Sequence, residues 1–76
     1  MESRFLVGEY EIEYSAIQLE AAFHAHVSVR LRRRYEEERI ARYTYYTEYD
    51  SAEAALAEAR RQAELVRGSP RGLPVS

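Results

Sequence analysis

The stretch "FHAHVSVRLRRR", Phe23–Arg34, places apolar and polar side chains at alternate positions almost throughout. Its apolar side carries phenylalanine, alanine, valine and leucine, and its polar side carries histidine, serine and arginine. Because successive side chains of a β-strand point to opposite faces of a sheet, this alternation predicts a strand with one buried face. The rest of the chain must then supply the neighbouring strands and a layer that covers the apolar face.

Two other segments have the composition of strands. Upstream, Glu9–Tyr14 ("EYEIEY") alternates strictly, with glutamates on one side and Tyr, Ile and Tyr on the other. Downstream, Ile40–Tyr49 ("IARYTYYTEY") is rich in residues that favour pleated surfaces, and its odd-numbered positions are the more apolar. Ile40 and Tyr46 are therefore expected to point away from the core. Residues 15–22 ("SAIQLEAA") fit a strand end, a helical turn or a loop equally well.

From Ser51 the apolar period changes to that of a helix, in "SAEAALAEARRQAELVRG". Alanine is the best helix former, and either Asp50 or Ser51 can cap the first turn. Gly68 supplies the stop. The predicted inward stripe is Ala52, Ala55, Leu56, Ala59, Ala63 and Val66.

These elements predict an α+β fold, a three-stranded antiparallel sheet with one C-terminal helix packed on one face, in the order β-β-β-α. We expect a single domain over residues 1–67. Residues 68–76, with two glycines and two prolines, are expected to be a flexible tail. Several apolar residues have no assured place in so small a core, and they are candidates for an interface. They include Phe5, Leu6, Val7, Ile17, Leu19 and Leu65.

Antiparallel pairing predicts which polar residues meet on the exposed face of this sheet. The predicted facing pairs are Glu13 with Ser28, Glu11 with Arg30 and Glu9 with Arg32. Glutamates would then neutralise arginines across the strands. A tight loop around Glu36 and Glu37 would set Arg32 opposite Arg42, a like-charge pair that costs stability unless an acid lies nearby.

Catalysis finds little support in the sequence, and we expect no enzyme and no cofactor. There is no cysteine, the serines have no oriented histidine beside them, and the glycines are too scattered for a phosphate loop. Carboxylates on an open sheet have no apolar pocket that would raise the pKa of one of them. The start of the chain holds no run long enough for a signal peptide or a membrane span, and we expect a cytoplasmic protein without membrane contact.

The preferred hypothesis is a non-catalytic protein-binding module, a small regulatory, inhibitory or phage-type accessory protein that acts by occluding a macromolecular partner. Arginine and tyrosine are enriched where protein surfaces carry most of their binding energy. The candidate partner-binding residues are Arg30, Arg32, Ile40, Arg42 and Tyr46. Open sheet edges and unplaced apolar residues also predict a homodimer.

Two alternatives remain open. The same arginines could bind phosphates while Tyr46 stacks on a base, although a chain with 11 basic and 13 acidic side chains lacks the basic character of most nucleic-acid-binding domains. His24 and His26 project from one side of a strand, and Glu48 could lie across from them as a third metal ligand. The chain has no third histidine, so no metal site is assigned and these three stay weak candidates.

Overall fold

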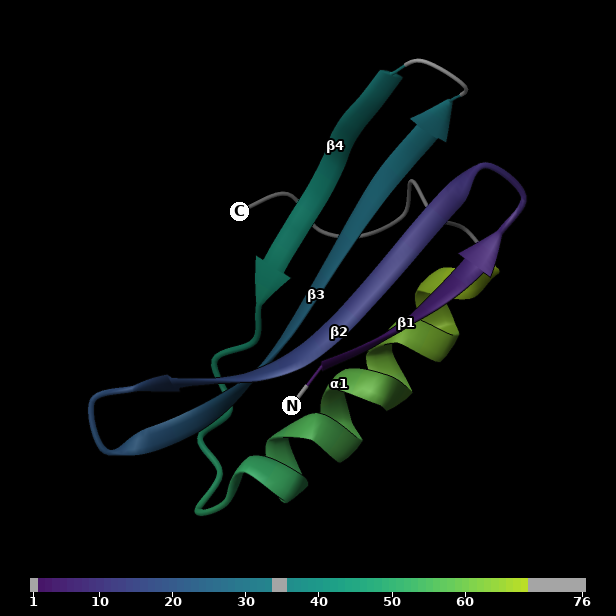
Figure 1. Ribbon diagram of the computed structural model, residues 1–76. Helices are drawn as coiled ribbons and strands as arrows, with labels where there is room; N and C mark the ends of the chain where they lie inside the picture. Colours follow the sequence, from purple (N-terminus) through teal and green to yellow (C-terminus); the bar gives the residue numbers. More distant parts are fainter. Residues whose placement is uncertain (1, 34–35, 69–76) are drawn as a thin grey trace.

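The computed structural model describes residues 2–33 and 36–68 and shows a four-stranded antiparallel sheet with one helix packed on it (Figure 1). The elements are β1 (Glu2–Val7), β2 (Tyr10–Leu19), β3 (Ala22–Arg33), β4 (Glu36–Thr44) and α1 (Ala52–Arg67). The strands lie side by side in chain order. The predicted α+β class, antiparallel sheet and C-terminal helix are confirmed, whereas the predicted number of three strands is wrong.

The additional strand is β1, which forms a hairpin with β2. Val7 faces Tyr10 across a two-residue turn whose first residue, Gly8, has φ +62°, a conformation that glycine adopts without steric cost. Phe5 and Val7 pack against the core, while Leu6 is 68% exposed. Two of the three unplaced apolar residues near the start of the chain therefore belong to the domain core.

The ambiguous segment, residues 15–22, consists of the end of β2, a two-residue turn and the start of β3. Leu19 faces Ala22, so the turn consists of Glu20 and Ala21. Glu20 has φ +58°, which lies in the left-handed region where side chains other than glycine are strained.

We expect Glu20→Gly to stabilise the protein by about 0.5–1 kcal/mol, because glycine relieves the left-handed strain at the cost of some unfolded-state entropy. Urea denaturation measures the change. Ala21→Gly is the matched control, since Ala21 is equally exposed and has no positive φ. A loss of stability in Glu20→Gly would contradict the strained turn.

The core lies between α1 and the sheet face that α1 covers. The helix begins after Ser51, whose Oγ accepts a hydrogen bond of 3.2 Å from the amide of Ala54, so Ser51 is the cap rather than Asp50. It packs on β2 and β3 and more lightly on β1. Its small side chains let it lie close to the strands. The buried helix residues are Ala55, Ala59, Ala63 and Val66. The last three form one core cluster with the buried sheet residues Ile12, Tyr14, Ala25, Val27, Val29 and Ala41.

The hairpin between β3 and β4 differs from the prediction. Glu36 and Glu37 belong to β4 instead of forming a loop, and Arg32 faces Glu37. Arg42 faces Ser28, so the predicted facing of Arg32 with Arg42 is wrong. The reason is that the strands run further toward the turn than expected, which shifts the register.

A β-bulge explains why the alternation is irregular in β4. Val29 faces Ala41 whereas the next residue, Arg30, faces Arg39, which leaves Ile40 as the extra residue. A bulge of this kind reverses the sides to which the residues before and after it point. The side chain of Ile40 lies outside the described residues, so its role as an outward contact stays a prediction.

The ends of the predicted elements differ in smaller ways. β4 ends at Thr44, and Tyr49 contributes an isolated bridge to Phe23 in place of a continued strand. α1 ends at Arg67. Residues 69–76, most of the predicted tail, lie outside the described residues, so the boundary between a domain and a tail stays a prediction. No helix among the described residues has the length and apolar character that crossing a membrane requires.

Candidate binding face of the sheet

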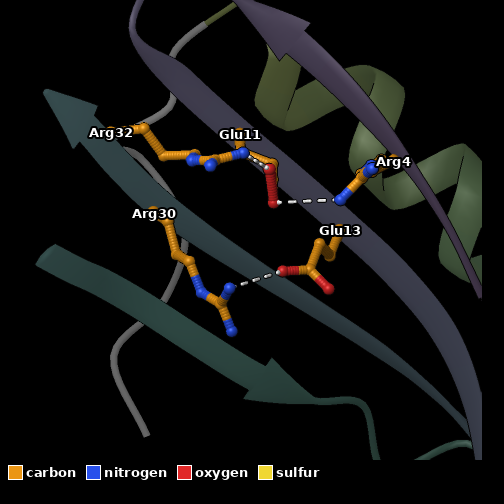
Figure 2. A network of polar contacts seen from close by, with 5 residues as sticks. All are labelled: Arg4, Glu11, Glu13, Arg30 and Arg32. Carbon is orange, nitrogen blue, oxygen red and sulfur yellow. Dashed lines mark hydrogen bonds and ion pairs between the residues drawn. The ribbon is translucent and has the colours of Figure 1, made fainter. Parts of the chain in front are cut away.

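The sheet face turned away from α1 carries five charged side chains joined in two separate sets of ion pairs (Figure 2). We call these five residues the charged cluster. Its members are Arg4 on β1, Glu11 and Glu13 on β2, and Arg30 and Arg32 on β3. They share a face because each lies at an alternate position of a strand whose intervening residues point toward α1.

Each glutamate of the charged cluster holds an arginine of the neighbouring strand. Arg32 Nη1 donates a hydrogen bond of 2.9 Å to Glu11 Oε2, and Arg30 Nη1 lies 3.4 Å from Glu13 Oε1. Both pairs run diagonally, since Glu11 faces Arg30 and Glu13 faces Ser28. The predicted facing of these residues is confirmed. Glutamates neutralise arginines across the strands as expected, but along the diagonal rather than between the facing residues.

The third predicted pair meets through the backbone. The amide of Arg32 donates a hydrogen bond of 2.7 Å to the carbonyl oxygen of Glu9. Glu9 itself is exposed and lies in the turn before β2. This hydrogen bond extends the pairing of β2 and β3 as far as Arg32 and so fixes the backbone from which the Arg32 side chain projects.

Glu11 is the most buried member of the charged cluster, at 2% exposure. Removing a carboxylate from water costs several kcal/mol unless charges and hydrogen bonds replace the solvent. Arg32 supplies the hydrogen bond, and Arg4 Nη1 lies 3.8 Å from Glu11 Oε1 on the other side. Glu11 therefore holds the guanidinium group of Arg32 by a hydrogen bond and attracts that of Arg4 more weakly, by an ion pair alone.

Arg4 was not among the residues selected from the sequence. It lies in β1, the strand that was not predicted from the sequence. Within the sheet it faces Glu13 of β2. The signal that reveals it is Gly8 after the apolar run Phe5–Val7, because a strand followed by glycine suggests a hairpin. Arg4 then falls on the same face as Glu11 and Glu13.

At the other end of the same face, the two histidines of β3 contact the last residue of β4 and the residue after it. His24 Nδ1 lies 2.9 Å from the carbonyl oxygen of Tyr45, so this nitrogen carries the proton. His26 Nδ1 lies 2.8 Å from Thr44 Oγ1. Within the described ranges, no three His, Asp or Glu residues are grouped as a metal site would require, and Glu48 is exposed.

Beside the histidines lies a hollow of about 250 Å³, which we call the tyrosine hollow. It is lined by Leu19, His24, Tyr43, Thr44, Tyr45 and Tyr46. The ring of Tyr43 meets those of Tyr45 and Tyr46 edge to face, with centroids 4.7 Å and 6.4 Å apart. Burial, followed by the nearby Tyr43, raises the pKa of Tyr45, so this hydroxyl stays neutral at physiological pH. Tyr46 is 86% exposed at the rim.

The candidate residues thus fall into separate regions. Arg30 and Arg32 belong to the charged cluster, and Tyr46 belongs to the tyrosine hollow. Arg42, an exposed residue of β4 opposite Ser28, lies two residues before Thr44 of the hollow. Arg30, Arg32 and Arg42 therefore lie on the face turned away from α1, whereas the tyrosine hollow lies at the end of β4 and includes Tyr43 and Tyr45, which pack against the core.

Comparison with models of protein families, with curated proteins and with solved structures finds no significant match to this chain. Its fold places it among small α+β proteins with an antiparallel sheet covered by one helix.

Proposed function

We propose that this protein is a non-catalytic protein-binding module, a small regulatory, inhibitory or phage-type accessory protein that acts by occluding a macromolecular partner. The observation that carries the proposal is the pairing in the charged cluster, where Glu11 and Glu13 engage Arg32 and Arg30. The face is consequently a surface of both signs rather than a track of positive charge. Mixed charges of this kind suit a partner whose surface also carries both signs.

The tyrosine hollow supports the same proposal. Binding energy in protein interfaces concentrates in a few aromatic and arginine residues near pockets from which water is excluded. Tyr46 is a large, exposed ring above a hollow lined by two further tyrosines. Its two side-chain torsions cost little entropy to order, so it is well suited to be an anchor.

Nucleic-acid binding is the competing proposal, and the ion pairs weigh against it. A phosphate would have to compete with Glu11 for Arg32 and with Glu13 for Arg30. The net charge of −2 adds a weak repulsion of any polyanion. Capture of a protein partner beside a nucleic-acid titration, both made on the same variants, separates the two proposals. We take the site of action to be the cytoplasm.

Self-association is a second part of the proposal. The sheet exposes β1 and β4 as edge strands, and unpaired edges invite pairing with another chain. We expect sedimentation equilibrium at tens of micromolar to give a mass near twice the 8.9 kDa of one chain. A monomer mass throughout this range, where dimers with a Kd of about 1 μM or tighter are populated, would remove the homodimer.

A further inference from the structure

The strand β1 places a charged side chain at an open edge of the sheet. β1 pairs with β2 on one side only, and no other described strand lies beyond it. An extended peptide can add to such an edge through main-chain hydrogen bonds, and side-chain contacts then select the sequence. Arg4 and Leu6 are the exposed side chains that a strand added to this edge would meet on the outer face.

Arg4 has donors to offer there. Its side chain is 66% exposed, and its contact with Glu11 Oε1 is an ion pair of 3.8 Å, longer than a hydrogen bond. The other oxygen of that carboxylate, Oε2, accepts a hydrogen bond of 2.9 Å from Arg32. Among the described residues, no hydrogen bond engages the guanidinium of Arg4.

Within the charged cluster, Arg30 and Arg32 each have a glutamate on β2, and Arg32 also faces Glu37 on β4. Glu11, the ion-pair partner of Arg4, is 2% exposed and is not available to an incoming group. A carboxylate beyond the edge of β1 would give Arg4 the hydrogen bonds that its position lacks. Arginine binds carboxylates through two parallel N–H donors.

We propose that β1 accepts an extended acidic segment of a protein partner, with one carboxylate of that segment bound by Arg4. The segment adds as a fifth strand beside β1, and its Asp or Glu takes the cross-strand position next to Arg4, where opposite charges stabilise a sheet. This inference rests on the proposed protein-binding function and names the chemistry of the partner.

Charge favours an acidic peptide segment at this edge over a nucleic acid or a second copy of the chain. A nucleic acid gains affinity by neutralising many phosphates along a track, whereas the edge at β1 offers the single arginine Arg4, with Glu11 and Glu13 on the neighbouring strand. A second copy adding in antiparallel register about Arg4 would bring Arg4 against its own equivalent, a like-charge pair. A single carboxylate on an extended segment fits both the edge and the charge.

The test is a titration of the ¹⁵N-labelled full chain with three blocked nonapeptides that alternate valine with aspartate, asparagine or lysine. We expect the aspartate peptide to shift the amide signals of β1 and to bind about tenfold more tightly than the asparagine peptide, with the lysine peptide weakest. Arg4→Gln should remove the advantage of aspartate. Arg60→Gln, an exposed arginine on α1, should retain it. Arg60→Gln should melt at the wild-type temperature, and Arg4→Gln should melt somewhat lower because it removes a charge beside the buried Glu11. The titration is therefore made at a temperature at which circular dichroism shows both variants to be folded.

Several results would overturn the inference: equal affinity for the aspartate and asparagine peptides, shifts outside β1, or wild-type selectivity in Arg4→Gln. Shifts of β1 signals caused by a nine-nucleotide thymidine oligomer, or by raising the protein concentration alone, would assign the edge to nucleic acid or to a second copy. The proposed function fails separately. If a natural protein partner is captured equally by Arg4→Gln and wild type, the acidic contact is wrong while protein binding stands.

Discussion

Replacing Ile12 by alanine is expected to lower the free energy of unfolding by about 2–5 kcal/mol, through lost apolar burial and the cavity left behind. Ile12 is fully buried on β2, where it faces Phe5 on β1 and Val29 on β3 beneath α1. Because a chain of 76 residues has a total stability of about 4–11 kcal/mol, this single change should remove a large part of it.

Urea denaturation followed by circular dichroism measures this loss. Leu65→Ala is the matched control, since Leu65 is 64% exposed on α1 and its truncation should change stability by no more than about 0.5 kcal/mol. Similar small losses in both variants would contradict the arrangement in which β1 and β3 close over Ile12. The result thus tests the placement of β1, the strand on which the acidic-segment inference depends.

The core of the fold could be predicted from the sequence because alternation is a direct consequence of strand geometry. The buried residues Val27 and Val29 on β3, and Ile12 and Tyr14 on β2, lie where their spacing predicted. α1 likewise begins directly after Ser51, one of the two residues that the sequence offered as its cap. Each of these features is determined by local chemistry, which a single sequence records.

The missing strand and the misplaced register have physical causes that the sequence conceals. Phe5–Val7 is a run of apolar residues in which Leu6 points to the exposed face, so no alternation marks β1. The turn at Glu20 lacks the glycine, asparagine or aspartate that ordinarily announces a left-handed residue. The bulge at Ile40 is a property of two paired strands, and neither strand alone indicates it.

The candidate site was predicted in part. The diagonal pairing of Glu11 and Glu13 with Arg32 and Arg30 follows from strand register, which the hydrophobic pattern fixed. The burial of Glu11 and its ion pair with Arg4 depend on β1, so they could not be predicted without that strand. The tyrosine hollow forms because β4 ends at Thr44 and the chain then continues beside His24 of β3. The sequence did not predict that end of the strand.

The central claim is that the protein binds a partner protein through the sheet face turned away from α1 together with the tyrosine hollow. It predicts a loss of partner when exposed residues near the tyrosine hollow are truncated. We choose Arg42→Ala combined with Tyr46→Ala, because both side chains are exposed and neither belongs to the core cluster. Truncation of interface anchors typically costs about 2 kcal/mol or more each, so affinity should fall at least about thirtyfold. Arg32 is left intact because it holds the buried Glu11.

The matched control combines Arg60→Ala with Leu65→Ala, an exposed arginine and an exposed apolar residue on α1. Both double variants should keep the melting temperature of the wild type to within a few degrees, since surface substitutions change stability by about 0.5 kcal/mol or less. A gel-shift titration on the same proteins, repeated at rising salt concentration, reports nucleic-acid affinity through the release of counterions.

The most direct test is quantitative capture of the partner that co-purifies with the tagged protein from its native host, compared among wild type, the Arg42→Ala, Tyr46→Ala variant and the control on α1. We predict that wild type and control capture the partner equally, that the Arg42→Ala, Tyr46→Ala variant loses it, and that none binds nucleic acid at micromolar concentration in physiological salt. Undiminished capture by that variant, together with salt-sensitive nucleic-acid binding that the same substitutions abolish, would contradict the proposal.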